Sequence, residues 1–287
     1  MNTKSLHEAT SRSVEYLLNF EPGSYRDFGD QLSHGASLAW TIACVASTLK
    51  ELGATWRLKK MTDFLLSLQG SEGEWSYNTI VPGDADSTLR AIQCLLKAGY
   101  SYDSTPVAKG VWFVVKHQQA DGGIATFLPE AVASLGYNNY EGWTASHSCV
   151  TALASRILPR SPAQKRAREF VLSRLRKGQA GAYWWLSPWY VRYEAGVRNG
   201  EPISNDPVDL GLYLLLQSKL KIADPYNLHR LWSLQLEDGG FPVSHQFRIP
   251  RPDQLSPTPE DEVVPDRSRI LATSAAGVAL ERQRKLH

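Results

Sequence analysis

A short motif that occurs three times constrains the fold of this chain more than any other feature. Each copy has a glutamine, then a glycine, then an apolar residue at fixed spacing: Gln69-x-x-x-Gly73-x-Trp75, Gln118-x-x-x-Gly122-x-Ile124 and Gln235-x-x-x-Gly239-x-Phe241. Every copy follows a segment whose apolar residues have helical spacing. The glutamine can bond free backbone groups at the helix end, the glycine can turn the chain, and the apolar residue can fill the turn. The motif therefore predicts a repeated helical unit.

Apolar periodicity and helix start and stop residues predict ten helices, over 4–20, 35–52, 56–69, 84–99, 106–119, 146–158, 162–177, 207–221, 224–236 and 267–285. Helices with a polar face alternate with helices built of Ala, Ser, Cys, Leu and Val, which are expected to be buried all round. Long connections, over 70–84, 120–146, 178–206 and 237–266, alternate with short ones. In stacked helical hairpins, insertions at one point of each repeat map to one face.

This alternation predicts an all-α fold: a single α/α-barrel domain over 1–287, with inner and outer helix rings made of about five to six hairpins. The long loops should lie on one rim of the barrel, each leading into an inner helix. We therefore expect the inner-helix N-termini at Gly35, Asp84, Ser146, Pro207 and Arg267 to converge on that rim.

The junction before the helix at 84–99 carries the strongest chemical signal, in the stretch VPGDADSTLRAIQCLLKAGY (81–100). Asp84, Asp86 and Ser87 lie where side-chain oxygens can accept hydrogen bonds from free backbone N–H groups. One interpretation is an N-cap with acidic residues in the first helical turn. The other is a functional pair of carboxylates, favoured because the junction belongs to a repeat and lies on the elaborated rim.

Composition and charge exclude several classes. The chain has 287 residues and a net charge of +2 with acids and bases interspersed, so no nucleic-acid partner is expected. Cys44, Cys94 and Cys149 lie in apolar helical segments without a CxxC pair, which favours reduced, buried thiols and a cytoplasmic protein. Neither an N-terminal apolar leader region nor a run of about 18 apolar residues occurs, so neither secretion nor a transmembrane segment is expected.

Aromatic residues are concentrated in the predicted rim loops. Such rings can pack a loop core or line a binding pocket, and their concentration on one rim favours the pocket. The expected substrate-binding residues are Trp75, Trp143, Trp184, Trp185, Trp189, Tyr190 and Phe241. A pocket of this kind suits an apolar ligand, and the faces of its rings would attract a cation by about 0.5–2 kcal/mol each.

The repeated motif resembles the QW repeat of class II terpene cyclases, such as squalene–hopene cyclases, and of the related prenyltransferase β subunits, which fold as α/α barrels. The segment PGDADST resembles the DxDD acid motif of the cyclases, whose middle Asp protonates an alkene or epoxide. The resemblance implies that Asp86 is the general acid, that Asp84 and Ser87 tune it, and that His147 is a partner or proton relay. It further implies a cofactor-independent isomerase or lyase of isoprenoid biosynthesis that cyclises a prenyl or prenyl-conjugated substrate.

The implied chemistry accounts for these residue types. Protonating an isolated alkene requires a carboxylic acid that is neutral at rest and is stabilised as carboxylate after its proton leaves. Burial raises the pKa, whereas hydrogen bonds and a helix N-terminus favour the anion. Water must also be excluded. The cyclases usually cover the site with a second barrel domain, so here the long rim loops, a homo-oligomer or a partner are expected to cover the pocket.

Two alternatives remain open at this point. Prenyltransferase β subunits hold zinc through Asp-x-Cys and a later His, and the equivalent places here are Asp84, Asp86 and His147, with His34 at the start of the preceding inner helix. Such an Asp/Asp/His set could bind zinc or another divalent metal, although the lost thiolate argues against protein prenylation. The other alternative is a non-catalytic barrel that binds a lipid or protein, because fold alone does not establish function.

Overall fold

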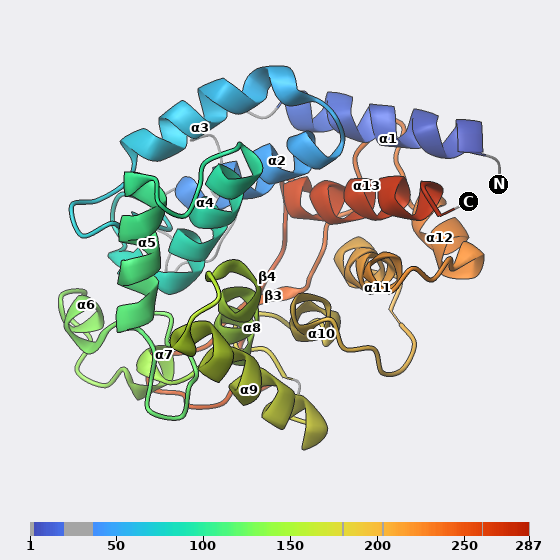
Figure 1. The fold of residues 1–287 in the computed structure, drawn as a ribbon. Coiled ribbons are helices and arrows are strands. Elements are labelled where there is room, and N and C mark those ends of the chain that lie inside the picture. The colour runs from blue at the N-terminus through green and yellow to red at the C-terminus, as the bar shows by residue number, and fades with distance from the viewer. Residues whose placement is uncertain (1–2, 20–36, 180, 203, 260, 287) are drawn as a thin grey trace.

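The computed structural model describes residues 3–19, 37–179, 181–202, 204–259 and 261–286, and its secondary structure is mostly helical (Figure 1). The helices are α1 Thr3–Leu18, α2 Ala39–Glu51, α3 Leu58–Ser67, α4 Ala85–Lys97, α5 Thr105–Lys116, α6 Pro129–Ala133, α7 Glu141–Thr144, α8 Ser148–Ile157, α9 Pro162–Arg176, α10 Trp189–Ala195, α11 Pro207–Lys219, α12 Pro225–Trp232 and α13 Ile270–Arg284. A 3-10 turn, Thr55–Arg57, precedes α3. Two short antiparallel pairs join β1 Trp75–Ser76 to β2 Gly83–Asp84 and β3 Phe247–Ile249 to β4 Glu262–Val264. No helix in these ranges is both long enough and apolar enough to cross a membrane.

Six helices form a closed inner ring. In order around the ring, α2, α4, α8, α10, α11 and α13 each contact the next, and α13 returns to α2. Outside this ring, α1 packs on α13, α3 on α2, α5 on α4, α9 on α8, and α12 on α11 and α13 (Figure 1). The predicted all-α barrel with two helix layers is confirmed. The inner helices are the more buried layer. In α11, for example, every residue from Pro207 to Ser218 is buried.

The long connections contain more structure than the sequence pattern predicted. Residues 178–206 were expected to be loop, yet they contain α10, whose Glu194 and Tyr190 point into the ring. The connection 120–146 contains α6 and α7, and the Pro-rich connection 237–266 contains the β3–β4 hairpin. The helix expected over 35–52 is described from Ala39 to Glu51, and both Gly35 and His34 lie outside the described residues.

The three glutamines tie consecutive outer helices together. Each Nε2 donates to the carbonyl of the glycine in its own motif, at 3.0 Å in all three copies. The same nitrogen also donates to an outer helix: Gln69 to Pro106 in α5, Gln118 to Ala163 in α9, and Gln235 to Ala9 in α1. The last of these bonds joins the end of the repeat series to its start. The motif therefore closes the outer layer as well as each turn.

The apolar residue of each motif plugs the space between layers, and a threonine of the next inner helix fixes it there. Trp75, Ile124 and Phe241 are fully buried. Their backbone N–H groups donate to Thr88 Oγ1 (3.0 Å), Thr151 Oγ1 (2.8 Å) and Thr273 Oγ1 (3.1 Å), respectively. These threonines give the register of the inner helices: Asp84 and His147 occupy equivalent positions, as do Asp86 and Cys149.

Replacement of a motif glycine is expected to destabilise the fold strongly. Gly73 has φ +93°, and a Cβ added there would lie 2.5 Å from the backbone carbon of Lys109 in α5. Gly53 has a similar φ of +84°, but nothing lies within 4 Å of its added Cβ. Gly53→Ala should therefore cost only the left-handed backbone term, about 1–2 kcal/mol. Gly73→Ala should cost about 1–3 kcal/mol more because of the collision. Urea unfolding of both variants measures the difference, and equal losses would refute the close approach of the layers.

The N-termini of the inner helices converge on one rim. The Ala85 N–H at the start of α4 donates to Thr126 O, and the His147 N–H at the start of α8 donates to Ile124 O in the same extended segment. The N-cap of α11 is reached by Ser244 Oγ, and Asp266 before α13 donates its N–H to Ser244 O. Leu38, which precedes α2, donates to Tyr77 O. The described junctions thus form one continuous rim, as predicted, and the long loops lie on it.

Candidate active site

An apolar cavity opens at the rim beside the start of α4. The cavity is partly open to solvent. Its wall is largely aromatic, from Trp40, Tyr77, Phe127, Trp184, Trp185 and Phe247. The polar side chains on this wall include Asp84, Asp86, Ser87 and Thr126. The cavity therefore combines a carboxylate pair with ring faces, which suits an apolar ligand that becomes cationic.

Two rim segments cover part of this cavity. The loop before α10 lies along β3: the Leu186 N–H donates to Gln246 O, and the Arg248 N–H donates to Trp184 O. Trp185 packs on Phe247 with ring centroids 4.4 Å apart. Residues of both segments line the cavity, so the long rim loops form part of its wall.

Asp84 is the N-cap of α4 and also has a buried, unpartnered oxygen. Its Oδ1 accepts a hydrogen bond from the Ser87 N–H at 2.7 Å, which is the capping arrangement expected from the sequence. Its Oδ2 is buried and has no hydrogen-bond partner among the described residues. Burial raises the pKa of Asp84 to about 7, against the lowering effect of its hydrogen bonds with Ser87, while the nearby Asp86 raises it further. Asp84 is thus largely protonated at mildly acidic pH.

The raised pKa of Asp84 makes the free energy of unfolding depend on pH. The pKa of Asp84 is about 7 in the folded protein and 3.8 in the reference state. Between about pH 4 and pH 7 the Asp84 carboxyl is therefore protonated in the folded state and ionised in the unfolded state. The free energy of unfolding is therefore highest below pH 4 and falls as the pH rises to 7. Asp84→Asn keeps the cap without the titration. We expect the wild type to lose stability across this window relative to the variant, on the order of 3 kcal/mol. Parallel curves of unfolding free energy against pH would contradict the assignment.

Asp86 lies in the first turn of α4 and is less buried than Asp84. Trp40 Nε1 of α2 donates to its Oδ2 at 2.8 Å. Burial raises the pKa of Asp86, the positive charge of Arg90 and the Trp40 hydrogen bond lower it, and the negative charge of Glu194 raises it. The balance is a raised pKa beside groups that favour the carboxylate once the proton has left.

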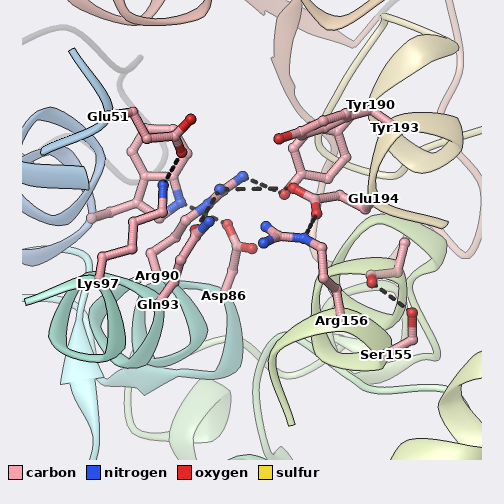
Figure 2. Close-up of polar contacts among 12 residues, drawn as sticks. Glu51, Asp86, Arg90, Gln93, Lys97, Ser155, Arg156, Tyr190, Tyr193 and Glu194 are labelled. Atoms are coloured by element: carbon pink, nitrogen blue, oxygen red, sulfur yellow. Dashed lines mark hydrogen bonds and ion pairs between the residues drawn. The ribbon is translucent and has the colours of Figure 1, made fainter. Parts of the chain in front are cut away.

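A buried charge cluster lies behind Asp86, deeper in the ring (Figure 2). Arg90, one helical turn after Asp86, donates to the hydroxyl of Tyr190 at 2.6 Å, and its Nη1 lies 3.8 Å from Glu194 Oε1. Arg156 of α8 pairs with the other oxygen of Glu194. The Glu194 side chain is 1% exposed, and the two arginines lower its pKa in spite of its burial. Arg90 and Glu194 were not among the predicted site residues, although Asp86 and Arg90 are four residues apart and so lie on one face of α4.

His147 is held as a neutral ring. Its Nε2 lies 2.7 Å from the carbonyl oxygen of Gly142, which can only accept, so Nε2 carries the hydrogen. Its Nδ1 therefore accepts from the hydroxyl of Thr126 at 2.6 Å. Burial lowers the pKa of His147 to about 4, and the ring stacks on Tyr183 at 3.9 Å.

The alternative metal set is not assembled. Both ring nitrogens of His147 are occupied by protein hydrogen bonds, which leaves no nitrogen lone pair for a metal. Across the described residues, no group of three or more His, Cys, Asp or Glu side chains is placed to hold a metal ion. The donor geometry of Asp84, Asp86 and His147 thus does not fit the site proposed by analogy with the prenyltransferases.

Three of the seven predicted aromatic residues line a cavity. Trp184 and Trp185 line the apolar cavity, and Tyr190 lines the deeper polar one, stacked on Trp185 at 4.1 Å. The other four rings belong to the packing: Trp75 and Phe241 plug the repeat turns, Trp143 packs behind Trp184, and Trp189 packs on Tyr213. None of these four lines either cavity. Trp40, Tyr77, Phe127 and Phe247 do line the apolar one but were not predicted.

Comparison with known proteins shows which proteins share this fold. No protein-family model matches the sequence, and no curated protein matches it. A variant of the type II terpene cyclase MstE from Scytonema, in complex with its substrate geranylgeranyl dihydroxybenzoate, is similar with a TM-score of 0.80, at 20% identity, over 99% of each chain. This chain has the fold of the type II terpene cyclases. The unliganded cyclase from Scytonema gives a TM-score of 0.79 at 20% identity over 100% of both chains.

Another solved structure, of a protein from Actinoplanes, is similar with a TM-score of 0.78 at 21% identity over 97% of this chain and 99% of that one. The Scytonema chains match over 99–100% of their length. Those cyclase chains therefore have no second barrel outside the matched region.

Proposed function

We propose that the protein is an acid-initiated terpene cyclase that closes rings in a prenyl chain, with Asp86 as the general acid. The observation that carries this proposal is the position of Asp86: a carboxyl of raised pKa in the first turn of an inner helix, on the wall of an aromatic cavity. Asp84 is a poorer donor because it is 3% exposed and its Oδ1 caps the helix. The shared fold with a type II cyclase supports the same conclusion.

In the proposed reaction, Asp86 is neutral at rest and gives its proton to an alkene carbon at the end of the prenyl chain. The resulting carboxylate keeps the Trp40 N–H hydrogen bond and lies at the N-terminus of α4, where the helix dipole favours negative charge. Arg90 adds a positive charge one turn away. Glu194 and Arg156 hold Arg90 in an ion-pair cluster, which limits how far that charge opposes the protonated state of Asp86.

The cation then migrates along the folded chain as rings close. The faces of Trp184 and Trp185 are available on the cavity wall, and each can stabilise a nearby cation by about 0.5–2 kcal/mol. The reaction ends when the cation loses a proton or is captured by water, so the enzyme would be of isomerase or lyase type. The substrate class we propose is a prenyl chain or a prenyl-conjugated small molecule, without a cofactor.

Incubation of the purified protein with geranylgeranyl dihydroxybenzoate, geranylgeraniol and farnesol tests this proposal. We expect mass spectrometry to detect a cyclised product with the mass of its substrate, or of its substrate plus water, from at least one of the three. Boiled protein is the blank for spontaneous acid cyclisation. Failure of all three substrates, with the protein folded by circular dichroism, would contradict the proposed function.

A further inference from the structure

Thr126 and His147 form a hydrogen-bonded pair on the wall of the apolar cavity that the initiation step leaves unused. Thr126 lies in the segment between α5 and α6, and its carbonyl accepts from the Ala85 N–H at the start of α4. Thr126 lines the same cavity as Asp86, and its hydroxyl is bonded to His147 at the start of α8. The pair therefore connects the cavity to a buried imidazole.

Each proton in this pair has a defined place. The His147 Nε2–H is held by Gly142 O, so its Nδ1 lone pair faces Thr126 and takes the hydroxyl hydrogen at 2.6 Å. Trp184 Nε1 donates to Thr126 Oγ1 at 2.7 Å. The oxygen has two lone pairs, and this donor occupies one of them. Among the described residues no further donor bonds this oxygen, so its other lone pair can accept a proton.

We propose that Thr126 and His147 together are the base that ends the cyclisation, by removing a proton from a carbon next to the final cation. This inference rests on the proposed function. The C–H electron pair becomes the new double bond and neutralises the cation, the proton goes to Thr126 Oγ1, and the hydroxyl hydrogen moves to His147 Nδ1. The resulting imidazolium returns its proton through Thr126 to water after the product leaves, and Asp86 takes a proton from water for the next turnover.

The weak basicity of His147 fits this task. A carbocation is so strong an acid at its neighbouring C–H bonds that a weak base suffices, whereas a stronger base would be protonated before the cation formed. His147 remains neutral at physiological pH because burial holds its pKa at about 4. When it takes the proton, the stacked ring of Tyr183 and the Gly142 carbonyl are in place to stabilise the charge. No charged side chain is a major influence on its pKa.

The test variant is Thr126→Val, which keeps the shape of the side chain and removes the hydroxyl. Protonation by Asp86 precedes the base, so the variant should still consume substrate. The wild-type product should fall by about tenfold or more relative to other alkene isomers and water adducts, since a positioned base contributes about 10²–10⁴-fold to its proton transfer. Thr126→Ser restores the hydroxyl and should restore the wild-type product ratio.

Thr151→Val is the matched control, because Thr151 is equally buried at the same helix junction and bonds backbone groups without lining either cavity. It should lose stability comparably yet keep the product ratio, which separates a catalytic role from a structural one. An unchanged product ratio in a folded Thr126→Val protein would overturn the inference alone. If the wild type turned over none of the three substrates, the proposed function would be overturned instead.

Discussion

Asp86→Asn is expected to lower the rate of prenyl-chain cyclisation by about 10²–10⁴-fold, the usual contribution of a positioned general acid. The amide has the shape of the carboxyl but cannot donate a proton of useful acidity. Trp40 can keep its hydrogen bond to the amide oxygen, so the fold should survive. Steady-state product formation, measured with the substrate that the wild type turns over best, gives the ratio of rates.

Asp209→Asn is the matched control for this prediction. Asp209 is another buried first-turn carboxyl of an inner helix with a raised pKa caused by burial, but it bonds Ser187 and lines neither cavity. Asp209→Asn should keep nearly full turnover at a similar melting temperature. If Asp86→Asn also kept full turnover, Asp86 would be removed from the mechanism and Asp84 would become the remaining carboxyl on the cavity wall.

Glu194→Gln is expected to cost about 3–5 kcal/mol of folding stability, the usual loss when one partner of a buried ion pair is removed. Glu194 lies between Arg90 and Arg156, and its side chain is 1% exposed. The variant leaves both arginines in the ring without this counter-charge. The lowered pKa of Glu194 means that its stabilisation is complete above its unfolded pKa and is lost as the pH falls through its folded pKa, so the comparison belongs at pH 7.

Asp63→Asn gives the scale for that loss. Lys59 and Asp63 form an ion pair on α3 at 2.6 Å, but their side chains are 84% and 54% exposed. Exposed pairs contribute about 0–1 kcal/mol. Urea unfolding at pH 7 should therefore separate the two variants clearly. Equal small losses would show that water reaches the Glu194 cluster and screens it.

The sequence predicted what depends on local repetition. The Gln69, Gln118 and Gln235 motifs determined the helical hairpins, and the junction at Asp84 and Asp86 followed from the capping and first-turn pattern. The capping interpretation is confirmed, since Asp84 caps α4. Asp86 lies on the cavity wall, and the functional interpretation stays a prediction. These features could be predicted because neighbouring residues determine them.

What the sequence could not give depends on contacts between distant segments. The short helix α10 carries no motif and begins in an aromatic loop, so its Glu194 could not be placed beside Arg90. An aromatic residue near a rim can face the cavity or the core, and only packing decides: Trp185 faces the cavity whereas Trp75 plugs a turn. Phe247 lies on the cavity wall because β3 pairs with β4 and lies along the loop before α10.

Deuterium labelling tests the central claim most directly. If Asp86 protonates the prenyl chain with a proton taken from solvent, turnover in D₂O should place one non-exchangeable deuterium in every cyclised product, at the carbon that was protonated. NMR of the product locates the label, and Asp86→Asn should form labelled product about 10²–10⁴-fold more slowly than the wild type. A cyclised product formed in D₂O without deuterium on carbon would contradict acid initiation and the role of Asp86.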